Sequence, residues 1–215
     1  MAVLEYSQER TVDPTEEPLT VDEVAAHVEY GGNDHDEKFV RWIRAAREQV
    51  EYDTDLALVT QTWVQRLDRP PETFWRDQNS RIMLDDLLFH LPGSGISRWL
   101  ELQKRPVQSL TSITYLDTAG DSQTMSSADY ELDTKRLQPV VWLAYNASWP
   151  ATRGIQNSLA ATYIAGYGAR TAVPQMLKQA MLMQIYSWFS CRGMNGGETR
   201  AYDRIIHQHR RPGYP

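Results

Sequence analysis

The apolar residues of the N-terminal third repeat with the period of an α-helix. Over residues 36–53 they recur every three or four positions and form one stripe: Phe39, Ile43, Ala46 and Val50. The charged residues of this segment lie largely off that stripe: Arg41, Arg44, Arg47 and Glu48. A shorter helix is expected directly after Thr20, because Thr20 and Glu23 have the spacing of a capping box. Together these patterns predict helices over residues 20–56.

A further helix is predicted near the C-terminus, over residues 174–191. Pro174 stands at the expected first helical position, where its fixed φ suits the helix. The predicted buried face then runs through Leu177, Met181, Ile185 and Trp188. Beyond the glycines that end this helix, one more short amphipathic turn is indicated by Ala201, Tyr202, Ile205 and Ile206.

The middle of the chain has the pattern of short β-strands. Runs such as "SLTSITYLD" and "VVWLAY" are rich in β-branched and aromatic residues. The stretch "DTAGD" between two such runs predicts a hairpin turn, in which Gly120 supplies a positive φ. The glycines of "ATYIAGYG" then predict the turn that leads from the last strand to the C-terminal helix.

As a whole, the pattern predicts an α+β protein that is mainly a helical bundle, with a central antiparallel β-hairpin region and a flexible C-terminal tail. In chain order we expect an extended N-terminal arm (1–18), a main domain (19–191) and the tail (192–215). Within the main domain, the two helical ends (20–56 and 174–191) flank a β region (about 60–168).

The charge is unevenly spread along the chain, whose formal net charge is −6. Residues 1–60 hold fifteen Asp and Glu against five Lys and Arg, whereas residues 192–215 hold five Arg against two acidic residues. An acidic body does not bind nucleic acid through counterion release, while a basic tail suits an acidic partner. The acidic N-terminus has no apolar signal-peptide core, and no apolar run approaches the length of about 20 residues that spans a membrane. We therefore expect a soluble protein without membrane contact.

Gly166 and Gly168 raise the question of a phosphate-binding loop, because they lie between a predicted strand and a predicted helix. A Walker loop requires G-x-x-x-x-G-K-[ST], and here no lysine occurs before Lys178. A dinucleotide fingerprint requires a third glycine and a following parallel strand, and neither is predicted. The sequence therefore favours a plain turn and no bound nucleotide.

The other candidate sites are weak. "LPGSGIS" (91–97) departs from the G-x-S-x-G nucleophile elbow, and "NDHDE" (33–37) lacks the length of a calcium loop. One cysteine, Cys191, excludes an internal disulfide and a cysteine-based zinc site, and it has no evident base partner. The histidines do not form an H-E-x-x-H motif: His27, His35, His90, His207 and His209. We predict no catalytic residue, no cofactor and no metal.

Four blocks nevertheless resemble a known family. They are "AAREQVEYDTDLALVTQTW", "RPVQSLTSITYLDTAG", "ATYIAGYG" and "VPQMLKQAML", in this order. Their order and spacing are similar to those of the tailed-phage head–tail connector (adaptor) family, whose members form the ring beneath the portal. The resemblance covers about residues 20–70 and 99–190. Residues 71–97 stand out as an insertion, and the acidic arm is longer than in compact members.

The resemblance implies a non-enzymatic ring subunit, commonly in twelve copies, that stacks on the portal and receives a tail or stopper protein. DNA would pass through the lumen without specific binding, and the protein would reside in the virion neck after assembly in the host cytoplasm. By the same resemblance, residues 192–215 would dock on the portal. The apolar anchors would be Tyr202, Ile205 and Ile206, and the charged partners would be Arg200, Arg204, Arg210 and Arg211.

Two other classes of function remain open from the residues alone. One is a small phage-encoded hydrolase or nuclease, which would need carboxylates gathered in one cleft; the spacing of Asp and Glu along the chain does not pair any of them. The other is a generic oligomerising scaffold outside any virion. An assay for rings on a portal separates the connector from both alternatives.

Overall fold

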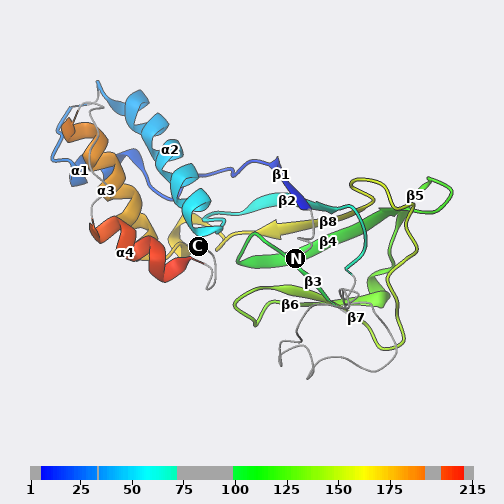
Figure 1. Ribbon diagram of the computed structural model, residues 1–215. Helices are drawn as coiled ribbons and strands as arrows, with labels where there is room; N and C mark the ends of the chain where they lie inside the picture. Colours follow the sequence, from blue (N-terminus) through cyan, green and yellow to red (C-terminus); the bar gives the residue numbers. More distant parts are fainter. Residues whose placement is uncertain (1–5, 33, 72–98, 192–199, 211–215) are drawn as a thin grey trace, which may run out of the picture. The chain divides into compact units, whose positions relative to one another are not determined.

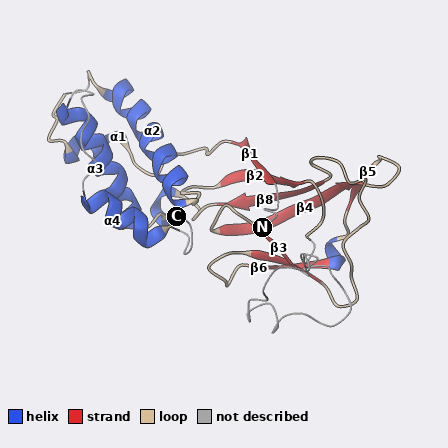
Figure 2. Cartoon of the chain, viewed as in Figure 1, coloured by secondary structure: helices blue, strands red, loops and turns tan. Residues whose placement is uncertain are grey.

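A computed structural model describes residues 6–32, 34–71, 99–191 and 200–210. These residues form four α-helices and eight strands. Figures 1 and 2 show how these elements follow one another along the chain. The helices are α1 (Val21–His27), α2 (Asp36–Thr54), α3 (Gln175–Cys191) and α4 (Arg200–His209). The strands are β1 (Tyr6–Val12), β2 (Gln61–Leu67), β3 (Trp99–Glu101), β4 (Val107–Leu116), β5 (Ser122–Thr124), β6 (Tyr130–Asp133), β7 (Val140–Leu143) and β8 (Leu159–Ala165).

The chain divides into two compact units. The first, here called the helical unit, comprises Arg10–Trp63, Gln103–Ser109 and Tyr163–Pro215. The second, here called the sheet unit, comprises Met1–Glu9, Val64–Leu102 and Leu110–Thr162. All four helices belong to the helical unit, and the three-stranded sheet belongs to the sheet unit.

The strands form two antiparallel sheets, with the orders β1-β2-β8-β4-β5 and β3-β7-β6. Along β8, every second residue is buried, from Leu159 to Ala165, as expected for a strand with one face toward a core. In the smaller sheet, Trp99 of β3 lies opposite Trp142 of β7, with ring centroids 5.0 Å apart. The "DTAGD" turn joins β4 to β5, and Gly120 has a φ of 98°, which confirms the predicted hairpin.

In the helical unit, α1, α2, α3 and α4 lie side by side around one apolar core (Figure 1). The predicted stripe of α2 is buried in full, which confirms it: Phe39, Ile43, Ala46 and Val50. The Thr20 hydroxyl accepts a hydrogen bond from the Glu23 amide, and the Glu23 carboxylate accepts one from the Thr20 amide, so the capping box is also confirmed. The C-terminal helix begins at Gln175, one residue after Pro174.

The prediction of a mainly helical bundle with a flexible C-terminal tail is wrong. The fold is α+β, with eight strands in two sheets beside the four helices, because the short runs between residues 99 and 165 pair across the sequence rather than in one local hairpin region. A strand, β1, also forms within the segment expected to be an extended arm. At the other end, residues 200–209 form α4, whose apolar side chains pack into the helical core.

The helices of the described residues include none that is long and apolar enough to cross a membrane.

Candidate functional site

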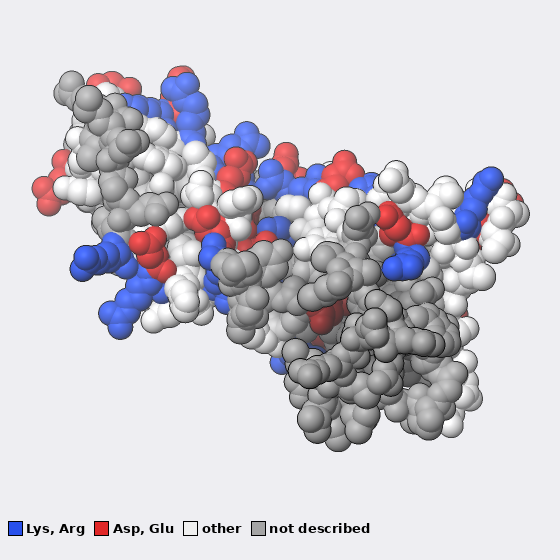
Figure 3. All heavy atoms as spheres, viewed as in Figure 1, with Lys and Arg blue, Asp and Glu red and all other residues white. Residues whose placement is uncertain are grey.

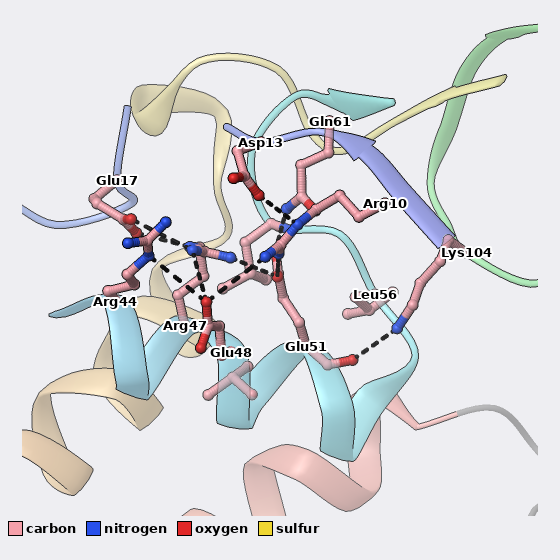
Figure 4. Close-up of polar contacts among 12 residues, drawn as sticks. Arg10, Asp13, Glu17, Arg44, Arg47, Glu48, Glu51, Leu56, Gln61 and Lys104 are labelled. Carbon is pink, nitrogen blue, oxygen red and sulfur yellow. Dashed lines mark hydrogen bonds and ion pairs between the residues drawn. The ribbon is translucent and has the colours of Figure 1, made fainter. Parts of the chain in front are cut away.

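A cluster of charged side chains, two buried and two partly buried, lies on one side of α2 (Figure 4). Its centre is Arg47, which has no solvent-exposed surface. The Arg47 Nε donates a hydrogen bond of 2.7 Å to Glu17, and its Nη1 donates one of 2.9 Å to Glu51. Arg10 of β1 adds a second guanidinium, 3.8 Å from the Glu51 carboxylate. We call these four residues the Arg47 cluster.

The pattern of α2 placed Arg47 largely off the apolar stripe and did not indicate that Arg47 is buried. Burial by itself lowers the pKa of the Arg47 guanidinium, but the hydrogen bond to Glu17 and the charge of Glu51 outweigh it, so the pKa is raised above its ordinary value. The only local signal was the i, i+4 spacing of Arg47 and Glu51 on the helix.

Glu51 connects α2 to the start of β2. Its Oε1 accepts a hydrogen bond of 2.8 Å from the Leu58 amide and another from the Gln61 side chain. Its Oε2 accepts the hydrogen bond from Arg47. Because both oxygens of a carboxylate that is 4% exposed are engaged by donors within the fold, the geometry assigns Glu51 to structural support rather than to proton transfer.

Lys104 lies at the other end of this buried region. Its Nζ donates a hydrogen bond of 3.2 Å to the Glu51 carbonyl, lies 3.9 Å from Asp55 Oδ1 and sits 5.2 Å from the centre of the Trp63 ring. Burial lowers the pKa of the Lys104 ammonium below its ordinary value of 10.5, and the charges of Asp55 and Glu51 oppose this only in part.

This shift predicts how stability depends on pH. Because the folded pKa of Lys104 lies below the unfolded one, the unfolded chain binds more protons between the two values, and the free energy of unfolding rises as the pH increases toward 10.5. A Lys104→Met variant should lack this contribution. Urea unfolding of the wild type and the variant across alkaline pH measures the difference between their free energies of unfolding. The titration of other groups is common to both proteins and cancels in this difference. Parallel curves for the two proteins would contradict the prediction.

The helix α4 carries most of the residues predicted to dock on a portal. Tyr202, Ile205 and Ile206 are only 5–6% exposed and belong to the core of the helical unit, so in this conformation they are not surface anchors. Arg200 and Arg204 are exposed. Figure 3 shows basic side chains (blue) projecting from the part of the helical unit where α4 lies. Arg211 lies outside the described residues.

Polar contacts hold α4 against the C-terminal end of α2. The Tyr202 hydroxyl donates a hydrogen bond of 2.8 Å to Asp53 Oδ2, and Arg210 Nε donates one of 3.0 Å to the Asp53 carbonyl. Arg105, which precedes β4, donates a hydrogen bond of 2.7 Å to the carbonyl of His209 at the end of α4. Arg210 therefore makes a contact within the helical unit, and its contact with a portal stays a prediction.

The two glycines of "ATYIAGYG" adopt positive φ angles, 125° at Gly166 and 113° at Gly168. The Gly166 amide donates a hydrogen bond of 2.8 Å to the Pro106 carbonyl, and the Thr60 amide donates one of 3.2 Å to the Gly168 carbonyl. A Cβ on Gly166 would lie 2.3 Å from the Val59 carbonyl oxygen. These facts confirm a turn that requires glycine for its backbone conformation and its close packing.

An open groove of about 1210 Å³ is lined by α1, α2 and α3, and it contains two of the histidines considered above. His27 meets the Tyr186 ring edge-on at 6.0 Å, and His35 stacks on Tyr30 at 4.7 Å. The Tyr30 hydroxyl also donates a hydrogen bond to Asp34, which explains the lowered pKa of that carboxyl. Asp34 and His35 of "NDHDE" therefore contact Tyr30 and pack locally at the start of α2.

The remaining candidates are placed as follows. His207 and His209 lie on α4, and Cys191 is the last residue of α3. Asn33, His90 and "LPGSGIS" lie outside the described residues. Within the described ranges, no three or more His, Cys, Asp or Glu residues are grouped as a metal site would require.

Comparison with known proteins identifies this fold. No protein-family model and no curated protein matches the sequence. Among solved structures, a chain of the neck of an empty gene transfer agent (GTA) particle, computed with C6 symmetry, aligns with a TM-score of 0.69 and 19% identity over 97% of this chain and 100% of that one. A chain of the native gene transfer agent virion aligns with a TM-score of 0.68 and 18% identity over 94% of each chain. A chain of the native GTA neck, computed with C12 symmetry, aligns with a TM-score of 0.64 and 20% identity over 98% of this chain and 100% of that one.

These alignments span nearly the whole of each chain, so they cover both the helical unit and the sheet unit. At 18–20% identity they define the fold: this chain has the fold of a protein found in the neck of gene transfer agent particles. The likeness to these chains is consistent with the head–tail connector family that the sequence resembles, whereas the mainly helical fold predicted from the sequence is not observed.

Proposed function

We propose that this protein is a structural subunit of the neck of a tailed-phage-like particle, where copies of it form a ring between the portal and a tail or stopper protein. The observation that carries the proposal is the whole-chain likeness to GTA neck chains, at TM-scores up to 0.69. Two of these neck structures were computed with C6 and C12 symmetry, which supports a ring of repeated subunits, commonly twelve.

The residues are consistent with an assembly role. In the Arg47 cluster, the buried charges bind one another and the backbone, which suits a framework rather than a reaction centre. The acidic balance of the chain suits a conduit through which DNA slides, because each Lys or Arg contact with phosphate adds affinity. In this proposal DNA crosses the lumen without specific binding, and the protein resides in the virion neck after assembly in the host cytoplasm.

Electron microscopy of the purified protein with its cognate portal tests the proposal. We expect rings of this protein stacked on one face of the portal ring. The portal alone and this protein alone are the controls. A mixture in which the two proteins sediment separately and form no joint rings would show that the proposal is wrong.

We further propose that the exposed side of α4, with the basic segment that follows it, contacts the portal. The exposed basic residues of the helix are Arg200 and Arg204, while its opposite side is fixed in the core by Tyr202, Ile205 and Ile206. A basic surface recognises an acidic one and accelerates association through long-range attraction. The arginines named by resemblance, Arg210 and Arg211, continue this basic character toward the C-terminus.

Reversing the charge of this surface should weaken binding to the portal. We expect Arg200→Glu with Arg204→Glu to lower affinity by about tenfold or more at low salt, and by less at high salt because the attraction is screened. Co-sedimentation with portal rings measures it. The control is Arg69→Glu with Lys135→Glu, which reverses two exposed charges in the sheet unit. Equal binding by both double variants would contradict the docking of α4.

A further inference from the structure

The geometry points to an interface between copies of this chain, formed by the outward side of α3. This side, which we call the α3 face, is formed by residues three or four positions apart: Met176, Gln179, Met183, Tyr186 and Ser190. Met176 is 49% exposed and Tyr186 is 51% exposed, although both are large apolar side chains. The opposite side of the helix is fully buried in the core of the helical unit, through Leu177, Ala180, Met181 and Ile185.

The α3 face is without charge. The helix contains a single charged residue, Lys178, whose side chain is 7% exposed and lies with Nζ 3.8 Å from a Glu23 carboxylate oxygen. The other three helices that the structure describes present charged side chains to solvent, such as Glu48 on α2 and Arg204 on α4. The centres of protein interfaces are depleted in charge. The α3 face therefore has the character of a surface that is covered in an assembly.

The α3 face continues into the open groove described above. Tyr186 belongs to both, and beyond it the groove is lined by the rings of Trp42, Trp188 and Phe189. Trp42 lies 6.4 Å from Trp188 and 6.5 Å from Phe189, so these rings form one aromatic surface. Partly exposed tryptophan and tyrosine are the side chains that most often anchor protein interfaces.

A complementary surface is present on α2. Its line of exposed residues begins with Val40, 52% exposed, and ends with Tyr52, 80% exposed. Between them, Arg44 Nε lies 3.7 Å from Glu48 Oε1, so the two charges of this line compensate each other. We call this line the α2 face. A surface whose charges are balanced internally can meet an uncharged partner without leaving a charge unpaired.

The dimensions and directions of the two faces agree. Val40 and Tyr52 are separated by about 18 Å along α2, and Met176 and Tyr186 by about 15 Å along α3, at 1.5 Å per residue. The buried stripe of α2 packs in the same core as the buried side of α3, so the two outward faces point away from each other. Contact of the α3 face with the α2 face of the next copy is therefore head-to-tail, which is the kind of interface that closes a ring. This inference rests on the proposed ring function.

The test introduces a charge into the α3 face. Tyr186→Glu should reduce portal-bound rings by about tenfold or more, because a carboxylate would be buried without a partner. Tyr145→Glu is the matched control: Tyr145 is 91% exposed in the sheet unit, and its variant should form rings as the wild type does. Thermal unfolding checks that both variants remain folded, since Tyr186 is 51% exposed and Tyr145 is 91% exposed. Rings are counted by electron microscopy.

A mixing experiment tests the pairing of the two faces. Tyr52→Glu alone should also prevent rings, whereas an equimolar mixture of the Tyr52→Glu and Tyr186→Glu proteins retains one intact interface per pair. Chemical cross-linking of that mixture on portals should therefore yield dimers and nothing larger. The inference would be wrong if the Tyr186→Glu protein formed rings as the wild type does, or if the mixture gave no dimers. Either result would leave the proposed function standing. Absence of rings from the wild type would overturn the proposed function as well.

Discussion

Replacing Arg47 with alanine is expected to lower the free energy of unfolding by about 3–5 kcal/mol. Arg47 is fully buried and supplies hydrogen bonds to Glu17 and to Glu51, whose carboxylate is 4% exposed. Without the guanidinium, the Glu51 carboxylate loses its nearest charged partner and keeps only the more distant Arg10 guanidinium, 3.8 Å away. Breaking a buried ion pair is far more costly than losing a surface pair. Urea unfolding followed by circular dichroism measures this loss.

Arg44→Ala is the matched control for this variant. Arg44 lies one turn earlier on α2, its side chain is 58% exposed, and it approaches Glu48 at 3.7 Å. Exposed pairs of this kind contribute about 0–1 kcal/mol, so the control should unfold almost as the wild type does. If both variants lose the same small amount, the Arg47 cluster does not support the fold, and the assignment of Glu51 as a structural carboxylate is wrong.

The burial of Arg47 shows which part of the site the sequence could not reveal. The i, i+4 spacing of Arg47 and Glu51 is visible in the sequence, but it is equally typical of a solvated helix surface. The decisive partner, Glu17, lies 30 residues earlier, in a segment without a helical or strand pattern. Whether an arginine is buried depends on which distant segment covers it, and hydrophobic periodicity carries no information on that.

The helices were predictable because their signals are local. The stripe of α2 and the Thr20 capping box each lie within a few turns of chain, and the structure confirms both. The apolar spacing of Tyr202, Ile205 and Ile206 also indicated an amphipathic turn. Its assignment to a flexible tail was wrong because the core that buries these residues is built by α2 and α3, from distant parts of the sequence.

The sheets were underestimated for a related reason. Strand β1, "YSQERTV", is almost entirely polar, so neither alternation nor β-branched content distinguishes it from an extended arm. It becomes a strand because β2 offers a partner about 50 residues later. Similarly, β3 and β7 have three and four residues, lengths at which sequence patterns are weak. They are strands because β7 pairs with β3 on one side and with β6 on the other.

Replacing Gly166 with alanine is expected to destabilise the helical unit by about 2–6 kcal/mol. A residue with a side chain at a φ of 125° costs about 1–3 kcal/mol. The new Cβ would also lie 2.3 Å from the Val59 carbonyl oxygen and 2.9 Å from the Thr60 amide nitrogen, and displacing packed atoms adds about 1–3 kcal/mol. The backbone cannot simply move away, because the Gly166 amide is bonded to the Pro106 carbonyl and its own carbonyl accepts a hydrogen bond from Gln108.

Gly168→Ala separates the two causes within the same turn. Gly168 also has a positive φ, 113°, but a Cβ there would have its nearest neighbour, the Ala172 Cβ, at 3.9 Å, which is an ordinary contact. This variant should therefore lose only the conformational part, about 1–3 kcal/mol. Urea unfolding of the two variants should differ by about 2 kcal/mol, the part that arises from the close approach of the Gly166 backbone to Val59. Equal losses would mean that conformation alone explains both glycines and that the packing of this turn tolerates a methyl group.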